Sequence, residues 1–300
     1  MDDAPDAPAD LSVELAQRAA ALLPDAATPG ALHVVSTPIG HLGDLSLRAL
    51  AVLASVGAIC CEDTRHARTL LQRYGIRTAT LALHEHNEAQ VTPRLVERLR
   101  AGEALALISD AGTPLVSDPG GRLVAAVVDV GLRVVPVPGA SAVLSALVAS
   151  GLPAHPFTML GFLPRKGSER TAALAMATTL PHTVVLYESP NRLVDTLHDL
   201  AAIAGPDRPV AVARELTKHF EELRRGTLPE VAAYYQEVPP RGEIVIVLGG
   251  APVVVVTEET LRATADTLRA EGLAPREIVQ RLTQQHGASR NLAYRLAHQE

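Results

Sequence analysis

One segment constrains the fold more than any other: an apolar run over residues 104–108 that stops abruptly at Ser-Asp-Ala-Gly-Thr-Pro. A short apolar run of this kind is typical of a strand buried on both faces. The loop after it contains Gly112, which can adopt backbone angles closed to other residues, and Pro114, which removes a hydrogen-bond donor. Ser117 or Asp118 is then expected to cap the next helix. At the carboxyl end of a buried strand, such a loop is where open α/β sheets bind small ligands.

A second loop of the same kind follows the next expected strand. Residues 133–137 run into Pro138-Gly139-Ala140-Ser141-Ala142, and a helix is expected after them. Both loops are built from Gly and Pro and are poor in charge, which favours a ligand with polar edges and an apolar body. Either loop alone is equally compatible with an ordinary strand-to-helix turn.

The alternation of strands and helices predicts an α/β protein with two α/β domains. Residues 31–152 are expected to form a first domain around a doubly wound, mainly parallel five-stranded sheet. Residues 153–251 are expected to form a second domain with a mixed sheet, because its third and fourth strands are too close in sequence for a crossover helix. Residues 257–300 are expected to form a small helical unit, similar to a helix-turn-helix or to a plain helical cap. The expected strands are Leu32–Ser36, Ala58–Cys61, Thr80–Leu83, Ala104–Ser109, Arg133–Val137, Phe157–Phe162, Thr183–Tyr187, Val210–Arg214, Glu222–Leu228 and Glu243–Leu248.

Composition narrows the class of protein. Residues 1–30 hold six acidic residues against one arginine, so most of the net charge of −6 lies in what is expected to be a loose tail with one short helix over Leu11–Leu23. No apolar run reaches the roughly 18 residues that a membrane span needs, and the start lacks the basic region of a secretory signal. The two cysteines, Cys60 and Cys61, are adjacent, which fits a reducing cytoplasm rather than a disulfide framework.

Polar side chains follow the second and third expected strands. Residues 62–66, Glu-Asp-Thr-Arg-His, would face the same crevice as the two glycine loops, although Asp63 or Thr64 could equally serve as the cap of the next helix. Residues 84–88, His-Glu-His-Asn-Glu, favour substrate contact or a solvated loop. A metal site is disfavoured, because two histidines two residues apart lack further ligands.

Several common sites are disfavoured by their missing motifs. The loop at residues 36–46 carries glycines but is not G-x-G-x-x-G, which disfavours a dinucleotide site. The sequence contains neither a P-loop, H-E-x-x-H nor G-x-S-x-G, which disfavours phosphate cradling, zinc hydrolysis and serine esterase chemistry.

Charged residues at 187–192, 214–218 and 241–243 could form one wall of an interdomain cleft or simply make salt bridges. The basic loop at residues 161–167 suits either an RNA backbone or plain solvent.

Taken in order, eight motifs resemble those of the ribosomal RNA small subunit methyltransferase I family, within the tetrapyrrole methylase superfamily. The resemblance runs from Leu32 to Gly249, and the helical tail is also similar. Tetrapyrrole members carry Gly-Asp-Pro after the fourth strand where this chain has Ser109-Asp110-Ala111, which disfavours a porphyrinoid substrate. The motifs are Thr37-Pro38-Ile39-Gly40, Glu62-Asp63-Thr64-Arg65-His66, His84-Glu85-His86-Asn87-Glu88, Ser109-Asp110-Ala111-Gly112-Thr113-Pro114, Pro138-Gly139, Gly161-Phe162-Leu163-Pro164, Tyr187-Glu188-Ser189 and Arg214-Glu215-Leu216-Thr217-Lys218.

The resemblance implies S-adenosyl-L-methionine as methyl donor, bound in the cleft between two α/β domains of a homodimer. The implied substrate is the 2′-hydroxyl of a cytidine in the decoding region of small-subunit (16S) ribosomal RNA, within the 30S subunit. RNA contacts are expected at Arg65, Arg165, Lys166 and Arg170. Cofactor contacts are expected at Pro38, Ser109, Asp110, Ala111, Gly112, Thr113, Pro114, Ser141 and Ala142 from the first domain, and at Glu188, Leu216 and Thr217 from the second.

A ribose hydroxyl is a weak acid, so a base is expected to assist its methylation. Some tetrapyrrole members place a proton-accepting Asp at the end of the second strand, which makes Asp63 the first candidate here and His84 the second. Lys218 could hold a phosphate or stabilise alkoxide charge. Two alternatives stay open: a small-molecule methyltransferase of the same superfamily, and a non-catalytic ribosome-binding protein.

Overall fold

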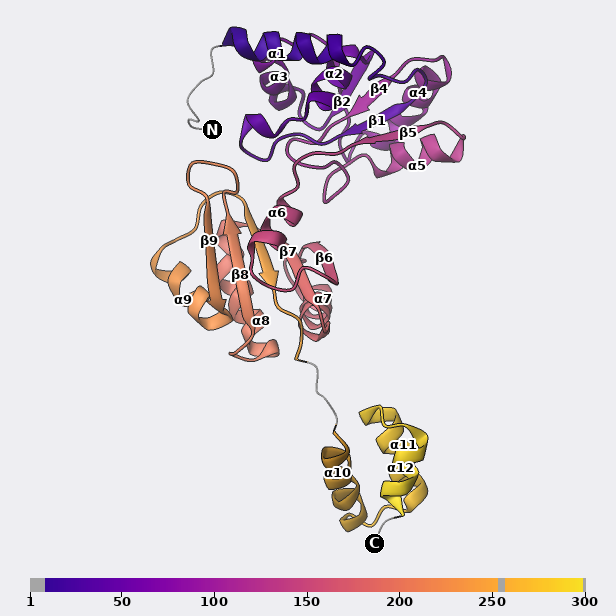
Figure 1. The fold of residues 1–300 in the computed structure, drawn as a ribbon, viewed down its shortest axis with the longest axis vertical. Coiled ribbons are helices and arrows are strands. Elements are labelled where there is room, and N and C mark those ends of the chain that lie inside the picture. The colour runs from indigo at the N-terminus through magenta and orange to yellow at the C-terminus, as the bar shows by residue number, and fades with distance from the viewer. Residues whose placement is uncertain (1–8, 253–256, 299–300) are drawn as a thin grey trace. The chain divides into compact units, whose positions relative to one another are not determined.

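The computed structural model describes residues 9–252 and 257–298 (Figure 1). The chain divides into two compact units, residues 1–251 and 252–300. The acidic residues before Ala9 and the valines at 253–256, both noted in the sequence, lie outside the described residues. Within the described part of the chain, every helix is too short or too polar to cross a membrane.

The first sheet has the strand order β3-β2-β4-β1-β5, and every pair in it is parallel, which confirms the predicted doubly wound sheet. Helices α1, α2 and α3 pack on one face, and α4 and α5 pack on the other. Because helices cover both faces of this sheet, its strands are nearly continuous apolar runs in the sequence. The elements are β1 (Leu32–Val35), β2 (Ala58–Cys61), β3 (Thr80–Ala82), β4 (Leu105–Leu107), β5 (Val134–Val137), α1 (Ala9–Leu22), α2 (Leu47–Ser55), α3 (Thr64–Arg73), α4 (Glu88–Arg100) and α5 (Gly121–Asp129).

Helix α1 corrects the expectation of a loose segment over residues 1–30. Its bounds nearly match the expected short helix, but Ala16 and Ala19 are almost fully buried in the core that α2 and α3 share with the sheet. Small side chains let α1 lie close to α2. The segment from Ala9 to Leu22 is therefore an integral layer of the first domain.

The second sheet has the order β6-β7-β10-β8-β9, in which β6 and β7 are parallel and the other pairs antiparallel, as the prediction of a mixed sheet requires. Helices α7, α8 and α9 cover one face. Helix α6 (Ala142–Ala149) packs on the other, in a cluster that also takes in Ile39 of the first domain. The elements are β6 (Phe157–Phe162), β7 (Thr183–Glu188), β8 (Pro209–Arg214), β9 (Glu222–Thr227), β10 (Ile244–Leu248), α7 (Gly167–Thr179), α8 (Leu193–Ala204) and α9 (Leu228–Glu237).

The C-terminal unit consists of α10 (Glu258–Ala270), α11 (Pro275–His286) and α12 (Arg290–Ala297). These three helices share a small apolar core of their own, formed by leucines, alanines and Ile278. Thr257 caps α10, Pro275 opens α11 and Gly287 ends it in a left-handed conformation.

Candidate functional site between the two α/β domains

The carboxyl ends of β1, β4 and β5 are tied together by hydrogen bonds between their loops. Thr37 and Gly112 exchange two backbone hydrogen bonds of 2.8 and 3.1 Å. The Thr37 hydroxyl donates to the Ser109 carbonyl at 3.2 Å, and the Thr113 hydroxyl donates to the Ala140 carbonyl at 3.1 Å. The two glycine loops that the sequence singled out, together with the β1 loop, thus form one rigid edge of the first sheet.

Gly112 lies at the centre of this edge with a φ of +79°, which L side chains rarely adopt. A Cβ built on it would lie 3.2 Å from Ile39 Cγ2 and 3.8 Å from the Ala140 carbonyl oxygen. The loop is therefore a cradle of backbone groups beside an apolar side chain. Such a cradle fits a ligand with polar edges and an apolar body, as predicted.

Among the described residues, four other than glycine have positive φ, and they lie in two segments at the junction of the two domains. These are Leu115 and Ser117 in the loop after β4, and Glu215 and Thr217 in the turn after β8. Backbone strain of this kind costs about 1–3 kcal/mol per residue and persists where the surroundings require it, most often at functional sites. A Cβ on Gly161 of β6 would lie 3.1 Å from Ser117 Oγ. The strained loop of the first domain therefore packs directly against the second.

The turn after β8 closes on the first domain at Gly40. A Cβ there would lie 2.8 Å from Thr217 Oγ1 and 3.1 Å from the Leu216 carbonyl oxygen, so only glycine fits. The backbone N–H of His41 donates to Thr217 Oγ1 at 3.0 Å. Leu216 and Thr217, predicted as cofactor contacts from the second domain, are thus brought to the predicted edge of the first.

Lys218, in the same turn, is held by two carboxylates. Its ammonium donates to Glu215 Oε1 at 2.9 Å and to Glu243 Oε2 at 3.1 Å. Burial opposes the charge, but these hydrogen bonds outweigh it and raise the pKa of Lys218. Because the two carboxylates already neutralise the ammonium, these ion pairs hold the turn after β8 in place. Its predicted catalytic role stays a prediction.

Asp63 is the N-cap of α3, which confirms the alternative reading of this residue. Its Oδ1 accepts from the Arg65 backbone N–H at 2.8 Å, and its Oδ2 lies 3.0 Å from the Arg65 guanidinium. Hydrogen bonds from the Arg65 side chain and backbone lower the pKa of Asp63 to about 2. A carboxylate with so low a pKa is a weak proton acceptor near neutral pH.

Asp118 is a candidate site residue that sequence reasoning missed. It is partly buried, and burial together with the charges of Glu62 and Asp110 raises its pKa to about 6. Across the domain junction, burial and the charge of Asp118 raise the pKa of Tyr187 on β7. A perturbed carboxyl group at the mouth of a ligand cradle is a candidate acid or base.

The expectation that Ser117 or Asp118 caps the following helix is wrong. Helix α5 begins at Gly121, with Gly120 in the cap position at a φ of 117° and without a side-chain cap. Pro119 and Gly120 separate Asp118 from the helix, so its carboxyl group does not cap α5. A side-chain hydrogen bond with Ser109 partly offsets the rise in the pKa of Asp118. That Pro-Gly pair was the signal in the sequence that could have identified Asp118.

Glu188 and Arg170 are committed to the frame of the second domain. The Glu188 side chain is 1% exposed and accepts hydrogen bonds from the Thr196 hydroxyl at 2.7 Å and the Ser189 N–H at 2.8 Å. Arg170 is 13% exposed and donates to Asp199 at 2.7 Å and to the Pro164 carbonyl. These contacts give both residues a structural role, and the predicted cofactor contact of Glu188 and RNA contact of Arg170 stay predictions.

Of the other predicted site residues, some are exposed at the surface and others form hydrogen bonds within the fold. Arg165 and Lys166 are exposed, whereas Ser141 caps α6 by accepting from the Leu144 N–H. His84 follows β3, where its N–H donates to Asn87 Oδ1 at 2.9 Å and its ring Nδ1 is buried without a partner in the described structure. Among the described residues, His, Cys, Asp and Glu side chains form no group of three or more that could hold a metal ion.

Comparisons with known proteins agree with the fold and the motifs. The family model described as "Tetrapyrrole (Corrin/Porphyrin) Methylases" matches residues 31–232. The methyltransferase CobJ aligns with a TM-score of 0.57 at 20% identity, over 73% of this chain and 94% of its own. A uroporphyrin-III C-methyltransferase from Thermus thermophilus, complexed with S-adenyl homocysteine, aligns at 0.52 and 22% identity, over 75% and 99% of the two chains. At these identities the two structures establish the fold alone.

Proteins found by sequence comparison share much higher identity with this chain than these two structures do. Proteins named Ribosomal RNA small subunit methyltransferase I are 51% identical in Mesorhizobium japonicum, over 74% of this chain and 76% of theirs, and 46% identical in Xylella fastidiosa, over 89% and 98%. The protein of that name from Escherichia coli O157:H7 is 42% identical over 89% of this chain and 94% of its own. The fold, the family model and these identities together place the chain in the ribosomal RNA small subunit methyltransferase I family of the tetrapyrrole methylases.

Proposed function

We propose that this protein transfers a methyl group from S-adenosylmethionine to the 2′-hydroxyl of a cytidine in the decoding region of 16S ribosomal RNA. Two observations on the segment after β4 carry the proposal: the backbone cradle at Gly112, and the raised pKa of Asp118 close to the charge of Asp110. The first offers backbone groups that would hold a donor, and the second offers a carboxyl group whose raised pKa suits a base for the acceptor hydroxyl. Membership of the family supports ribosomal RNA as the acceptor.

The residues of the domain junction fit the proposed cofactor. The loop Ser109–Pro114 and Pro38 would hold it from the first domain, and Leu216 and Thr217 from the second. When bound, S-adenosylmethionine supplies a methyl group already activated by its sulfonium, and methylation of a hydroxyl releases one proton. The chain therefore has to align the donor with the hydroxyl, exclude water and accept that proton.

The pKa values favour Asp118 over Asp63 as the proton acceptor. General bases work best when their pKa lies near the working pH, and Asp118, at about 6, meets this condition whereas Asp63, at about 2, does not. Asp63 is also engaged as a helix cap by Arg65. We assign the base to Asp118 and the capping of α3 to Asp63.

The pH dependence of methyl transfer tests this assignment. If Asp118 must be ionised, the single-turnover rate should rise with pH, with an apparent pKa of about 6, and level off above it. If Asp63 were the base, the rate should be flat between about pH 5 and 8, because its pKa is about 2. A His84→Gln variant should keep the rise near pH 6, and loss of the rise in that variant would contradict the assignment.

The exposed pair Arg165 and Lys166 is proposed to contact the RNA backbone, with Arg65 at the edge of the site. An Arg165→Ala/Lys166→Ala variant should bind 30S subunits more weakly and with a flatter salt dependence, because phosphate contacts are lost, while its cofactor affinity stays unchanged. Arg170→Ala should instead lower the melting temperature, since its guanidinium bonds to Asp199 and Pro164. Equal salt slopes for the double variant and wild type would remove this loop from the RNA surface.

A direct test of the function is methyl transfer from labelled S-adenosylmethionine to 30S subunits that lack the modification. We expect transfer to the RNA, and mass spectrometry of the RNA should locate the methyl group on a cytidine ribose. Porphyrinoid and corrinoid precursors serve as the competing substrates. Transfer to these alone would establish the small-molecule alternative, and an absence of cofactor binding by calorimetry would favour the non-catalytic one.

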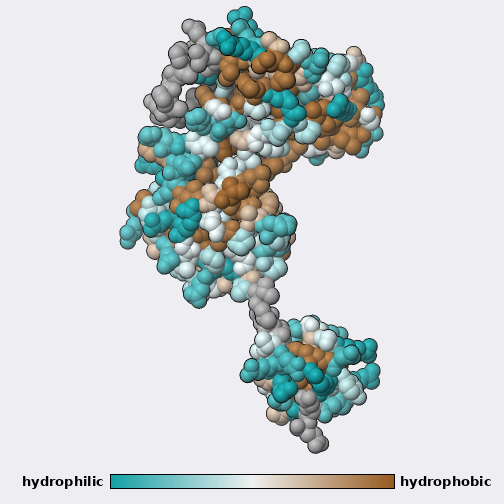
Figure 2. All heavy atoms as spheres, viewed as in Figure 1, coloured by the Kyte–Doolittle hydropathy of each residue, from teal (hydrophilic) through white to brown (hydrophobic). Residues whose placement is uncertain are grey.

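A homodimer is proposed from the exposed face of α6. Leu144 and Val148 lie one turn apart on this helix and are 52% and 75% exposed, and Figure 2 shows hydrophobic residues gathered in this region. A Leu144→Glu/Val148→Glu variant should be monomeric by light scattering where the wild type is dimeric. A monomeric wild type would contradict the proposal.

The ribosomal substrate and the two buried free thiols, Cys60 and Cys61, favour a cytoplasmic location.

A further inference from the structure

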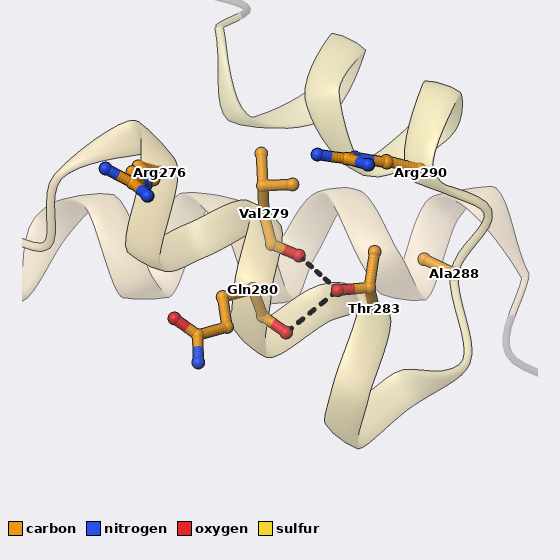
Figure 3. A pocket seen from close by; sticks show the side chains of 6 residues that line it. All are labelled: Arg276, Val279, Gln280, Thr283, Ala288 and Arg290. Atoms are coloured by element: carbon orange, nitrogen blue, oxygen red, sulfur yellow. Dashed lines mark hydrogen bonds between the residues drawn. The ribbon is translucent and has the colours of Figure 1, made fainter.

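The C-terminal unit contains a groove of about 450 Å³ between α11 and the start of α12. Figure 3 shows Arg276 at one end and Arg290 at the other, with Val279 between them. Gln280, Thr283 and Ala288 complete the lining. The groove therefore has two cations, one amide and a small apolar floor, and its lining contains no acidic residue.

These two arginines differ from others in the same unit. Arg262 and Arg295 both pair with Glu258, and Arg269 pairs with Asp266 at 2.6 Å. Arg276 and Arg290, by contrast, have neither an ion-pair nor a hydrogen-bond partner within residues 257–298. The unit thus neutralises part of its positive charge internally and leaves the two groove cations, together with Arg281 outside the groove, without an ion-pair partner among residues 257–298.

The positions of Arg276 and Arg290 on their helices are also unfavourable for helix stability. Arg276 follows Pro275 in the first turn of α11, and Arg290 is the first residue of α12. The helix dipole favours acidic residues in a first turn and disfavours cations there. An anion bound between the two guanidinium groups would reverse this disadvantage, because helix N-termini attract anions.

We propose that this groove is a second RNA-binding site, in which Arg276 and Arg290 hold a phosphodiester of the ribosomal RNA backbone. Guanidinium groups form charge-assisted hydrogen bonds with phosphate oxygens, and the apolar surface of Val279 and Ala288 suits the carbon edge of a ribose. The inference rests on the proposed function, because the RNA substrate supplies the phosphate. It adds to the methyl-transfer site a contact that selects and holds RNA.

The test is an Arg276→Ala/Arg290→Ala variant of the full-length protein, with binding to 30S subunits measured between about 50 and 200 mM salt. Affinity should fall roughly ten-fold or more, and the slope of log K against log salt should become shallower by about 1 to 2. The KM for 30S subunits should rise while the rate at saturating 30S and the cofactor Kd stay unchanged.

The matched control is Arg262→Ala/Arg281→Ala, which removes two positive charges from the same unit but from outside the groove. A decrease in slope as large as that of the groove variant would overturn the inference in favour of non-specific charge. An Arg276→Gln/Arg290→Gln variant should lose as much of the salt slope as the alanine variant, because it also removes both charges, and it tests the inference if the alanine variant fails to fold. A wild-type slope in the folded glutamine variant would overturn the inference.

The outcomes separate this inference from the proposed function. If wild type methylates 30S subunits and the groove variant keeps its KM and salt slope, the groove inference alone fails. If wild type methylates no ribosomal RNA at all, the proposed function fails. Unchanged RNA binding of the groove variant, with altered binding of an acidic protein of the ribosome, would identify a protein partner and likewise overturn the RNA assignment.

Discussion

Replacing Asp118 by Asn is expected to lower the single-turnover rate of methyl transfer by roughly 10²–10⁴-fold, the contribution typical of a general base. Asparagine keeps the size and polarity of the side chain but cannot accept the hydroxyl proton. Cofactor and RNA binding should persist, because neither depends on the proton. The measurement is a rapid-quench single turnover at saturating 30S and S-adenosylmethionine, which reports chemistry rather than binding.

The Asp118→Asn variant should lose methyl-transfer rate without losing folding stability. The pKa of Asp118 in the folded protein, about 6, lies above its ordinary value of 3.8, because burial, Glu62 and Asp110 disfavour its ionised form. Folding stability contributed by the protonated group is therefore present below about pH 4 and is lost as pH rises through about 6. At neutral pH, Asp118→Asn removes that unfavourable ionisation, so the variant should melt at the same temperature as wild type or a higher one.

Asp63→Asn is the matched control, since it replaces another carboxylate of the same edge. Asparagine caps helices about as well as aspartate, so both the melting temperature and the single-turnover rate should stay near wild type. Asp63→Ala should lower the melting temperature by removing the bond to the Arg65 N–H. A large rate loss in Asp63→Asn, with a normal rate in Asp118→Asn, would return the base to Asp63.

Replacing Gly112 by Val is expected to abolish measurable cofactor binding in a protein that still folds. Gly112 has a φ of +79°, and a Cβ there would lie 3.2 Å from Ile39 Cγ2. A β-branched residue adds strain of about 1–3 kcal/mol at such a φ and places its methyl groups in the cradle. Calorimetric titration of S-adenosylmethionine into the variant, after its melting temperature has been recorded, measures the effect.

Gly131→Val provides the control for strain alone. Gly131 has a nearly equal φ of +73°, but a Cβ there meets no atom within 4 Å, and it lies in the turn between α5 and β5, away from the cradle. This variant should lose stability yet bind S-adenosylmethionine as wild type does. Wild-type cofactor affinity in a folded Gly112→Val protein would remove this loop from the cofactor site.

Most of the fold could be predicted from the sequence because strand and helix patterns are local. Apolar runs such as Ala58–Cys61 and Phe157–Phe162 identified strands with the bounds that the structure has. The glycine- and proline-built loops could be placed at the carboxyl edge because the direction of a parallel strand follows from the chain itself. The packing of α1 was not predictable in this way, since an alanine-rich, acidic helix carries no sign of its partner.

The candidate site was predicted only in outline. The predicted loops do lie together at one edge of the first sheet, but the chemical state of each side chain depends on partners that are distant in sequence. Glu243 neutralises Lys218 from 25 residues away, and Thr196 accounts for the buried carboxylate of Glu188. In the sequence, these groups are indistinguishable from free ones.

The sequence by itself determined the family, the two α/β domains and the loops that face the domain junction, because periodicity and turn chemistry are encoded by neighbouring residues. Only the tertiary structure sets how readily each carboxyl group of the site ionises. Asp63 and Asp118 are both acids in loops after strands of one sheet, yet a hydrogen-bonded arginine lowers the pKa of the first and burial beside two carboxylates raises that of the second. Desolvation and charge proximity are properties of the folded chain, since they depend on which side chains meet and on how much water remains between them.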